Sequence, residues 1–224
     1  MHPKVLTPNQ KSLLGLLHRK FARDFYLAGG TAIALQIGHR RSIDFDLFTN
    51  HEIKRNAIKQ AFDNGPFQIQ KVIYSAYDQL HLIVNEIKLT FFAYPYQIEA
   101  PIAFQRKINL PCLLDLAAMK ALALGGRGKW KDYVDLYFLL KDHFNIEAIE
   151  ARARSIFKEY FNRKLFREQL AYFEDIDYSE AIDYVGKELS PETIKDFLTH
   201  VAISPIEGQE PRIKTKEKST FKYS

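Results

Sequence analysis

The chain has 224 residues, of which 46% are hydrophobic and 26% charged, and it carries a formal net charge of +5 with a pI of about 9.1. This composition is ordinary for a soluble globular protein. No apolar run reaches the roughly 20 residues of a membrane-spanning helix, and the N-terminus shows no export signal. We therefore expect a cytoplasmic protein without a membrane partner. The single cysteine, Cys112, excludes an internal disulfide framework, and its apolar surroundings predict a buried thiol.

The first elements along the chain lead to a pair of glycines. Residues 8–24 carry apolar side chains at helical spacing, and residues 25–28 are predicted as a strand. The pair Gly29-Gly30 allows the backbone to turn sharply and to approach a ligand closely. A short helix over residues 31–37 directs its unbonded N–H groups to the same region, which suits a phosphate group.

A basic turn and a strand with two acidic residues follow this helix. Asp44 and Asp46 are two residues apart, so their side chains point to the same face of a strand. Neighbouring carboxylates repel each other unless a cation lies between them, and Mg²⁺ prefers oxygen ligands of this kind. A Gly-Gly pair alone indicates a turn, and an Asp-x-Asp pair alone indicates a solvated strand face. Together, and about fourteen residues apart, they favour nucleotide chemistry.

These features resemble the opening motif of nucleotidyltransferases of the DNA polymerase beta type. More narrowly, they are similar to the AbiEii/AbiGii toxin family, which includes the MenT toxins of bacterial toxin–antitoxin systems. The resemblance is carried by Gly29, Gly30, Thr31, His39, Arg40, Ser42, Asp44 and Asp46. It implies an enzyme that uses Mg²⁺ and a nucleoside triphosphate, with Asp44 and Asp46 as catalytic and metal-binding residues. It further implies that the nucleotide is bound by Gly29, Gly30, Thr31, Arg40 and Ser42.

The middle of the chain is predicted to complete a sheet. Residues 52–62 are expected to form a helix and residues 67–74 a half-buried strand. Residues 81–84 and 87–94 are expected to pair as an antiparallel hairpin about Asn85-Glu86.

The strand over residues 87–94 departs from the family pattern. Lys88 and Thr90 share one face, and Lys88 is a further candidate nucleotide-binding residue. Enzymes of this type commonly carry a third carboxylate where Thr90 stands, and a neutral hydroxyl cannot replace it as a metal ligand or proton acceptor. Three alternatives follow: Asp44 and Asp46 suffice with one Mg²⁺, another acid substitutes, or catalysis is weakened or lost.

Beyond Pro101 the sequence is predicted to be helical. Residues 111–124 form an apolar helix whose Lys120 either extends to solvent or reaches a triphosphate as a point charge. A cationic, glycine-rich turn follows, and Asp132 opens the next helix, where an aspartate is often a cap.

The pattern Lys…Ala-Leu…Arg…Lys-Asp-x-x-Asp-Leu resembles the second signature of the AbiEii-like toxins. It implies that Lys120 and Asp132 are catalytic, and that triphosphate or RNA is contacted by Arg127, Lys129 and Lys131. Asp135 is interpreted equally well as structural, and Trp130 either stacks on a base or anchors the helices.

The last third carries none of the family motifs, since the resemblance covers about residues 20–140. Residues 151–173 are rich in basic and aromatic side chains, which favours amphipathic packing over RNA docking. The net positive charge is compatible with a nucleic-acid partner but does not establish one.

The sequence therefore predicts an α/β fold in which residues 1–105 form a nucleotidyltransferase core with a short mixed sheet flanked by helices. Residues 106–203 are expected to form a helical region that completes the active site, and residues 204–224 a disordered tail.

The leading functional hypothesis is an Mg²⁺-dependent nucleotidyltransferase toxin that transfers a nucleoside monophosphate to RNA, with an antitoxin encoded nearby. Because some members of the resembled family add nucleotides to the acceptor end of tRNA, tRNA is the expected acceptor. One alternative is transfer to a protein side chain or to a small molecule such as an aminoglycoside. The other is an inactive nucleotide-binding module, because of Thr90.

Overall fold

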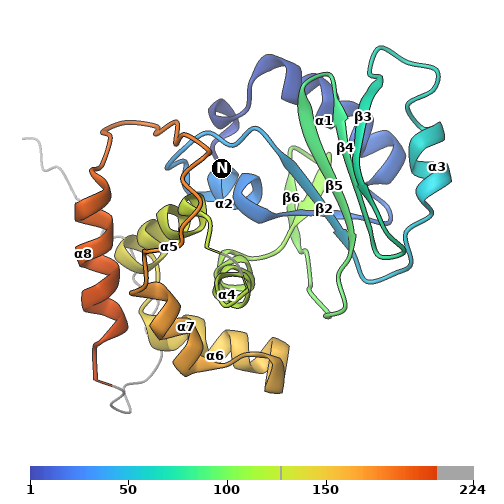
Figure 1. Ribbon diagram of the computed structural model, residues 1–224. Coiled ribbons are helices and arrows are strands. Elements are labelled where there is room, and N and C mark those ends of the chain that lie inside the picture. The colour runs from blue at the N-terminus through green and yellow to red at the C-terminus, as the bar shows by residue number, and fades with distance from the viewer. Residues whose placement is uncertain (127, 206–224) are drawn as a thin grey trace, which may run out of the picture. The chain divides into compact units, whose positions relative to one another are not determined.

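The computed structural model describes residues 1–126 and 128–205 and divides into two compact units (Figure 1). Unit 1 comprises Met1–Leu116 and Tyr178–Leu189, and unit 2 comprises Ala117–Asp177 and the described residues from Ser190 onward. The boundary falls within helix α4 (Leu113–Leu124). Within the described ranges, no helix has the length and apolar character needed to cross a membrane. Residues 206–224, for which a disordered tail was predicted, lie outside the described residues.

Unit 1 is built on a five-stranded sheet in the order β1-β2-β5-β4-β3. β2 and β5 are parallel and the other neighbours are antiparallel, so the predicted short mixed sheet is confirmed. The strands are β1 (Tyr26–Ala28), β2 (Phe45–Thr49), β3 (Ile69–Ser75), β4 (Gln79–Val84) and β5 (Ile87–Ala93). The predicted hairpin between β4 and β5 is also confirmed, and its two turn residues, Asn85 and Glu86, have positive φ angles of 46° and 68°. Such a turn matches the twist of the strands that it joins.

One face of this sheet is the core of unit 1. Leu27, Leu47, Phe91 and Leu80 lie side by side on four strands, and none of them is exposed. Helix α1 (Pro8–Phe21) contributes to this core, and the ring of its last residue, Phe21, lies 5.0 Å from that of Phe91. Two helices complete this part of the unit, α2 (Gly29–Ile37) and α3 (Arg55–Gln60), with a short 3-10 helix at Pro3–Val5.

The prediction that the chain is helical beyond Pro101 is wrong for residues 102–110. These residues form a two-stranded antiparallel ribbon of β6 (Ile102–Phe104) and β7 (Ile108–Leu110). Gln105 and Arg106 reverse the chain with positive φ angles of 50° and 55°. Strands of three residues are too short to show a period of two, so the sequence carried no usable signal for them.

A distant segment completes unit 1. Residues 178–189 return to the basic turn before β2, where Arg40 pairs with Tyr184. The amide of Arg41 donates to the carbonyl of Asp183 at 2.7 Å, and the two side chains form an exposed ion pair at 3.0 Å. The basic turn is therefore held by backbone pairing with a segment more than one hundred residues away.

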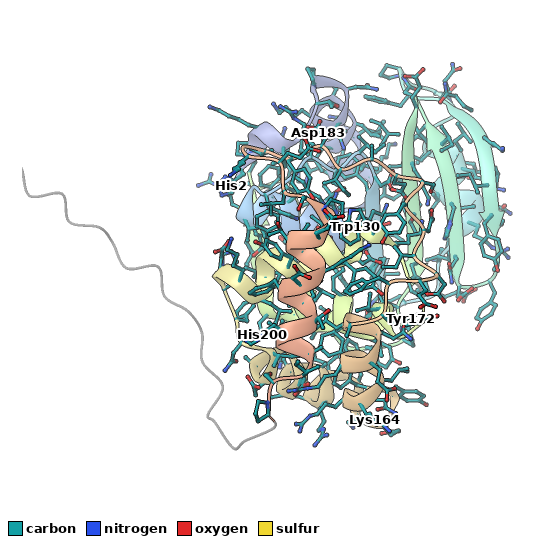
Figure 2. The ribbon with its side chains drawn as sticks, turned by 60° about the vertical axis from the view of Figure 1, so that its left-hand side comes forward. His2, Trp130, Lys164, Tyr172, Asp183 and His200 are labelled. Atoms are coloured by element: carbon teal, nitrogen blue, oxygen red, sulfur yellow. The ribbon has the colours of Figure 1, made fainter. Side chains whose placement is uncertain are left out.

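Unit 2 is helical, as predicted. It contains the rest of α4, then α5 (Trp130–Asp142), α6 (Ile146–Phe157), a 3-10 turn (Lys158–Tyr160), α7 (Arg163–Leu170) and α8 (Pro191–Ala202). Side-chain oxygens of Asn145, Asn162 and Ser190 accept backbone N–H groups at the starts of α6, α7 and α8, so each helix begins at a capping residue. Trp130, labelled in Figure 2, is buried. Its ring stacks on that of Tyr133 and lies 6.0 Å from the ammonium of Lys195, which favours its interpretation as a helix anchor.

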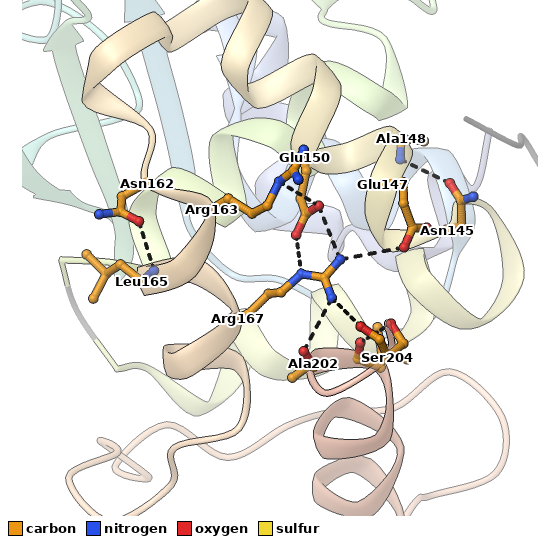
Figure 3. Close-up of polar contacts among 11 residues, drawn as sticks. Asn145, Glu147, Ala148, Glu150, Asn162, Arg163, Leu165, Arg167, Ala202 and Ser204 are labelled. Carbon is orange, nitrogen blue, oxygen red and sulfur yellow. Dashed lines mark hydrogen bonds and ion pairs between the residues drawn. The ribbon is translucent and has the colours of Figure 1, made fainter. Parts of the chain in front are cut away.

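A buried ion-pair network joins three helices of unit 2 (Figure 3). The guanidinium of Arg167 donates to both carboxylate oxygens of Glu150, which is 1% exposed. It also donates to the carbonyls of Ala202, the last residue of α8, and of Ser204. Arg163 adds a second contact to Glu150 at 3.1 Å. The hydrogen bonds that Arg167 donates to Glu150 raise the pKa of Arg167 above its ordinary value. These two arginines are engaged within the protein, which favours packing over RNA docking for this part of residues 151–173.

Substitution of Arg167 is expected to destabilise unit 2. Arg167→Ala leaves Glu150 buried without its main partner, which should lower the free energy of unfolding by about 3 kcal/mol. The measurement is urea unfolding followed by tryptophan fluorescence, because the one tryptophan of the chain, Trp130, lies in unit 2. Lys164→Ala is the control, since its ion pair with Glu168 is exposed and should contribute little. Equal unfolding curves for the two variants would contradict the prediction.

Candidate functional site

The carboxylate of Asp46 lies against the first residue of α2. Ala28 pairs antiparallel with Asp46, which brings Gly29 next to it. Gly29 has a φ angle of +67°, and a Cβ atom at this position would lie 2.1 Å from Oδ2 of Asp46. Glycine is required here on both counts, because other residues avoid this backbone conformation and would collide with the carboxylate. The glycine pair was expected to let the backbone approach a ligand closely. In the structure the backbone at Gly29 closely approaches the carboxylate of Asp46.

Asp44 is held to the same helix through its backbone. It precedes β2, which begins at Phe45, and is half-buried. The hydroxyl of Thr31 donates a short hydrogen bond to the carbonyl of Asp44, and Thr31 is only 1% exposed. The sequence assigned Thr31 to phosphate binding; in the structure its hydroxyl positions Asp44. Ser42 is fixed in turn by α1, where the side chain of Gln10 donates to its carbonyl at 2.7 Å.

Arg40 is folded into unit 1 rather than extended from it. It is 4% exposed, and its guanidinium donates to the carbonyl of Arg41 at 3.1 Å. Its backbone pairs with Tyr184. Arg40, which was expected to bind the nucleotide, therefore lies in the basic turn that residues 178–189 hold in place. Its observed contacts are with other residues of unit 1.

A row of side chains crosses the sheet at Asp46. In the strand register, Asp46 lies beside Thr90 of β5, and Thr90 lies opposite His81 of β4. Residues paired in this way place their side chains on the same face, which we call the Asp46 face. Lys88 lies on this face too, two residues before Thr90, and is half-buried. The Asp46 face is opposite the buried face that forms the core.

Asp44 and Asp46 suit a hard divalent cation such as Mg²⁺. Their donor atoms are carboxylate oxygens, and Mg²⁺ commonly takes one or two protein carboxylates while water and substrate phosphates fill its other positions. Across residues 1–126 and 128–205 there is no group of three or more His, Cys, Asp or Glu side chains that could hold a metal. Because two carboxylates leave the other positions of such an ion to water and phosphate oxygens, Asp44 and Asp46 fit a cation bound jointly with a phosphate substrate.

Two predicted site residues of unit 2, Lys120 and Asp132, form a buried group with Asp135. The ammonium of Lys120, which is 6% exposed, makes a short ion pair with Asp132 and another, of 2.9 Å, with Asp135. Both acids are fully buried. Asp132 lies in the first turn of α5, whose N-cap residue is Lys129. The bonding shows that Asp132 and Asp135 together fix Lys120, so the alternative that Lys120 extends to solvent is wrong.

Arg127, a predicted nucleotide-binding residue in the turn before α5, lies outside the described residues. The structure describes the neighbouring residues of this turn. Lys129 is half-buried, and its backbone pairs in parallel with Asp177. The amide of Asp177 donates to the carbonyl of Gly128 at 2.8 Å, which anchors this turn within unit 2.

His81 was missed by the motif reasoning. A two-residue hairpin turn sets the register of its strands, so counting back from Asn85-Glu86 places residue 81 opposite residue 90. Burial and the nearby cation of Lys88 lower the pKa of His81, against the opposing charges of Asp46 and Asp78. Cys112, which was predicted to be buried, is half-buried. Burial raises the pKa of its thiol above the ordinary value.

A separate cavity of about 530 Å³ lies in unit 1 between α1 and α3. Phe21, Phe25 and Ile58 supply its apolar wall, and His51 and Lys54 lie at it as well. None of the predicted site residues lines this cavity, so it is distinct from the Asp46 face.

Comparison with known proteins gives one family match and several relatives. Residues 11–202 match the family model described as "Nucleotidyl transferase AbiEii toxin, Type IV TA system". An uncharacterized protein of Aquifex aeolicus (strain VF5) is 29% identical over 202 residues, which cover 87% of this chain and 94% of that protein.

Solved structures with the same fold include MenT4, a nucleotidyltransferase toxin of Mycobacterium tuberculosis H37Rv. It has a TM-score of 0.60 at 15% identity, with 87% of this chain and 80% of MenT4 covered. A putative nucleotidyltransferase from Helicobacter pylori has a TM-score of 0.55 at 18% identity, with 90% and 91% covered. At these identities the likeness shows the fold.

The contact between Gly29 and Asp46 can be tested through stability. Gly29→Ala forces an unfavourable φ angle and a collision with the carboxylate, which should lower the free energy of unfolding by about 2 kcal/mol or more. Gly65→Ala is the matched control, because a Cβ atom there meets no atom within 4 Å. Chemical denaturation followed by circular dichroism measures both. If Gly29→Ala is as stable as Gly65→Ala, Asp46 does not lie where the structure places it.

Proposed function

Because the chain belongs to the AbiEii family of nucleotidyltransferase toxins of type IV toxin–antitoxin systems, we propose that it transfers a nucleoside monophosphate from a nucleoside triphosphate to a hydroxyl group of RNA, with tRNA as the expected acceptor. The membership confirms the resemblance found in the sequence, and the mixed sheet and the structural neighbours confirm the fold class. The observation that carries the proposal is the placement of Asp46 against Gly29 at the start of α2, with Asp44 tied to the same helix.

In the proposed reaction the protein mainly positions charge. Asp44 and Asp46 would hold Mg²⁺, which would supply positive charge to the triphosphate and to the leaving pyrophosphate. The N–H groups at the start of α2 lack helical partners, and that of Gly30 donates to phosphate oxygens. The bond from Thr31 keeps the Asp44 backbone in place. An acceptor hydroxyl then attacks the α-phosphorus in line, forming one O–P bond while the bond to pyrophosphate breaks.

The buried ion pairs of unit 2 give Lys120 a defined position. Two fully buried carboxylates form ion pairs with its ammonium group. The position of this positive charge is therefore fixed within unit 2, and the side chain does not extend into solvent. We assign Lys120 to a phosphate group of the substrate as a point charge, with Asp132 as the residue that orients it. Family membership also supports a protein partner, an antitoxin encoded nearby.

Thr90 favours a second candidate function. It stands beside Asp46 in the register, and its neutral hydroxyl adds no negative charge to the pair of carboxylates. A protein of this kind that binds a nucleotide without transferring it would keep the same contacts at Asp44 and Asp46. Transfer and binding must therefore be measured separately.

Removing either carboxylate should abolish transfer. The wild type, Asp44→Asn and Asp46→Asn are incubated with labelled nucleoside triphosphates, Mg²⁺ and either total tRNA or total protein. Loss of charge at this position should reduce the labelling rate by about 100-fold or more. Asp63→Asn serves as control, because Asp63 is an exposed aspartate outside the site.

The acceptor and the second candidate are resolved by the same assay. Label on tRNA supports the proposal, and label on protein moves the activity to a different acceptor. Binding of the triphosphate by the wild type without label on any acceptor supports the non-catalytic alternative. Full activity in both asparagine variants would contradict the assignment of the site.

A further inference from the structure

His81 shares the face of the sheet that carries Asp46. β4 places His81 opposite Thr90, and β5 places Thr90 beside Asp46, so the three residues form one row across three strands. Neighbouring strands lie about 4.8 Å apart, which puts the backbones of Asp46 and His81 about 10 Å apart. Their side chains project from the same face, on either side of Thr90.

The transfer reaction needs a proton acceptor in this region. An attacking hydroxyl loses its proton as the new O–P bond forms, and a positioned base accelerates that step. Within the row, Asp46 is assigned to the cation and Thr90 carries a hydroxyl that is not a base. Lys88 is a cation on the same face. The imidazole of His81 is the group of this row suited to accept a proton near neutral pH.

The surroundings of His81 hold its ring in a defined orientation. Nε2 lies 3.0 Å from Oε1 of Gln79, and the ring of Tyr74 packs beside it with centroids 5.5 Å apart. Because the amide oxygen of Gln79 only accepts hydrogen bonds, Nε2 carries the ring proton and Nδ1 carries the lone pair. A histidine with one nitrogen anchored and the other basic is arranged as a general base.

The charge environment keeps the ring neutral. The groups that act on it are Lys88 on β5, Asp46 on β2 and Asp78 just before β4, and the phenol ring of Tyr74 on β3 is in contact. Burial and Lys88 outweigh the two carboxylates, so the pKa of His81 lies below its ordinary value of 6.5. At pH 7 the imidazole is therefore in the form that can take up a proton.

We propose that His81 is a catalytic residue that takes the proton of the acceptor hydroxyl. The inference deepens the proposed function and rests on it. The O–H proton moves to Nδ1 of His81, the hydroxyl oxygen forms a bond to the α-phosphorus, and the bond from that phosphorus to pyrophosphate breaks. Pyrophosphate leaves with the electron pair of that bond, and His81 releases its proton to water before the next turnover.

The first test compares His81→Gln and His81→Ala with the wild type and with His51→Ala, a control in the separate cavity. We expect kcat for nucleotide transfer to fall by about 100-fold or more in both His81 variants. The Kd for the nucleoside triphosphate, measured without acceptor, should remain that of the wild type. In the wild type, kcat should rise with pH through the pKa of His81 and decline below it. An NMR titration of the His81 ring gives that pKa independently of activity, and it should match the acid limb of the profile.

The second test is rescue from the neighbouring strand. Thr90 lies between Asp46 and His81, so a carboxylate there reaches the same substrate position. The double variant with His81→Ala and Thr90→Asp should have a kcat at least tenfold higher than that of the His81→Ala single variant. The acid limb of its pH profile should follow the ionisation of the new carboxylate and not that of an imidazole.

The outcomes separate the two proposals. Transfer by the wild type with equal kcat and an equal pH profile in His81→Gln overturns the role of His81 and leaves the proposed function intact. Loss of triphosphate binding in both His81 variants also overturns it, because the residue would then be structural. Absence of transfer by the wild type to any acceptor overturns the proposed function, and the role of His81 with it.

Discussion

The contact between the backbone of Gly29 and the carboxylate of Asp46 is the constraint on which the candidate site depends. It joins three elements at one point, since β1 ends there, α2 begins there and β2 presents its acid there. A side chain at Gly29 would separate α2 from the sheet and turn Asp46 away from the helix start. The amide groups of the first turn favour negative charge, so the same contact suits a carboxylate and, beside it, a phosphate.

Local chemistry explains what was predictable from the sequence. The Asn85-Glu86 turn depends on neighbours within four residues, and it is present. Long-range partners had no such signal. The family resemblance implies that Thr31 binds the nucleotide, and only the structure shows that its hydroxyl donates to the carbonyl of Asp44, thirteen positions later. The resemblance implies that Arg40 binds the nucleotide, and only the structure shows that residues 183–185 pair with its turn.

Burial of charge distinguishes unit 2 from an ordinary helical packing unit. Lys120 with two acids, and Glu150 with two arginines, each remove ionised groups from water, which is costly unless the geometry compensates. The Glu150 group joins helices and ends at carbonyls at the C-terminal end of α8, so its evident role is to fix packing. The Lys120 group joins α4 to α5 and matches the second family signature. The family resemblance pointed to Lys120 and Asp132 as site residues. Only the structure shows that Asp135 forms a second ion pair with Lys120.

Unit 1 is discontinuous along the chain, because residues 117–177 intervene before residues 178–189 return to the basic turn. During synthesis the ribosome delivers the carboxylate pair and the glycine pair early, but the strand partner of Arg40 emerges about 140 residues later. The turn that leads into β2 therefore acquires its last contacts late, after most of unit 2 has left the exit tunnel. Such long-range closure slows folding, and it makes a nascent chain that stops before residue 178 an incomplete enzyme.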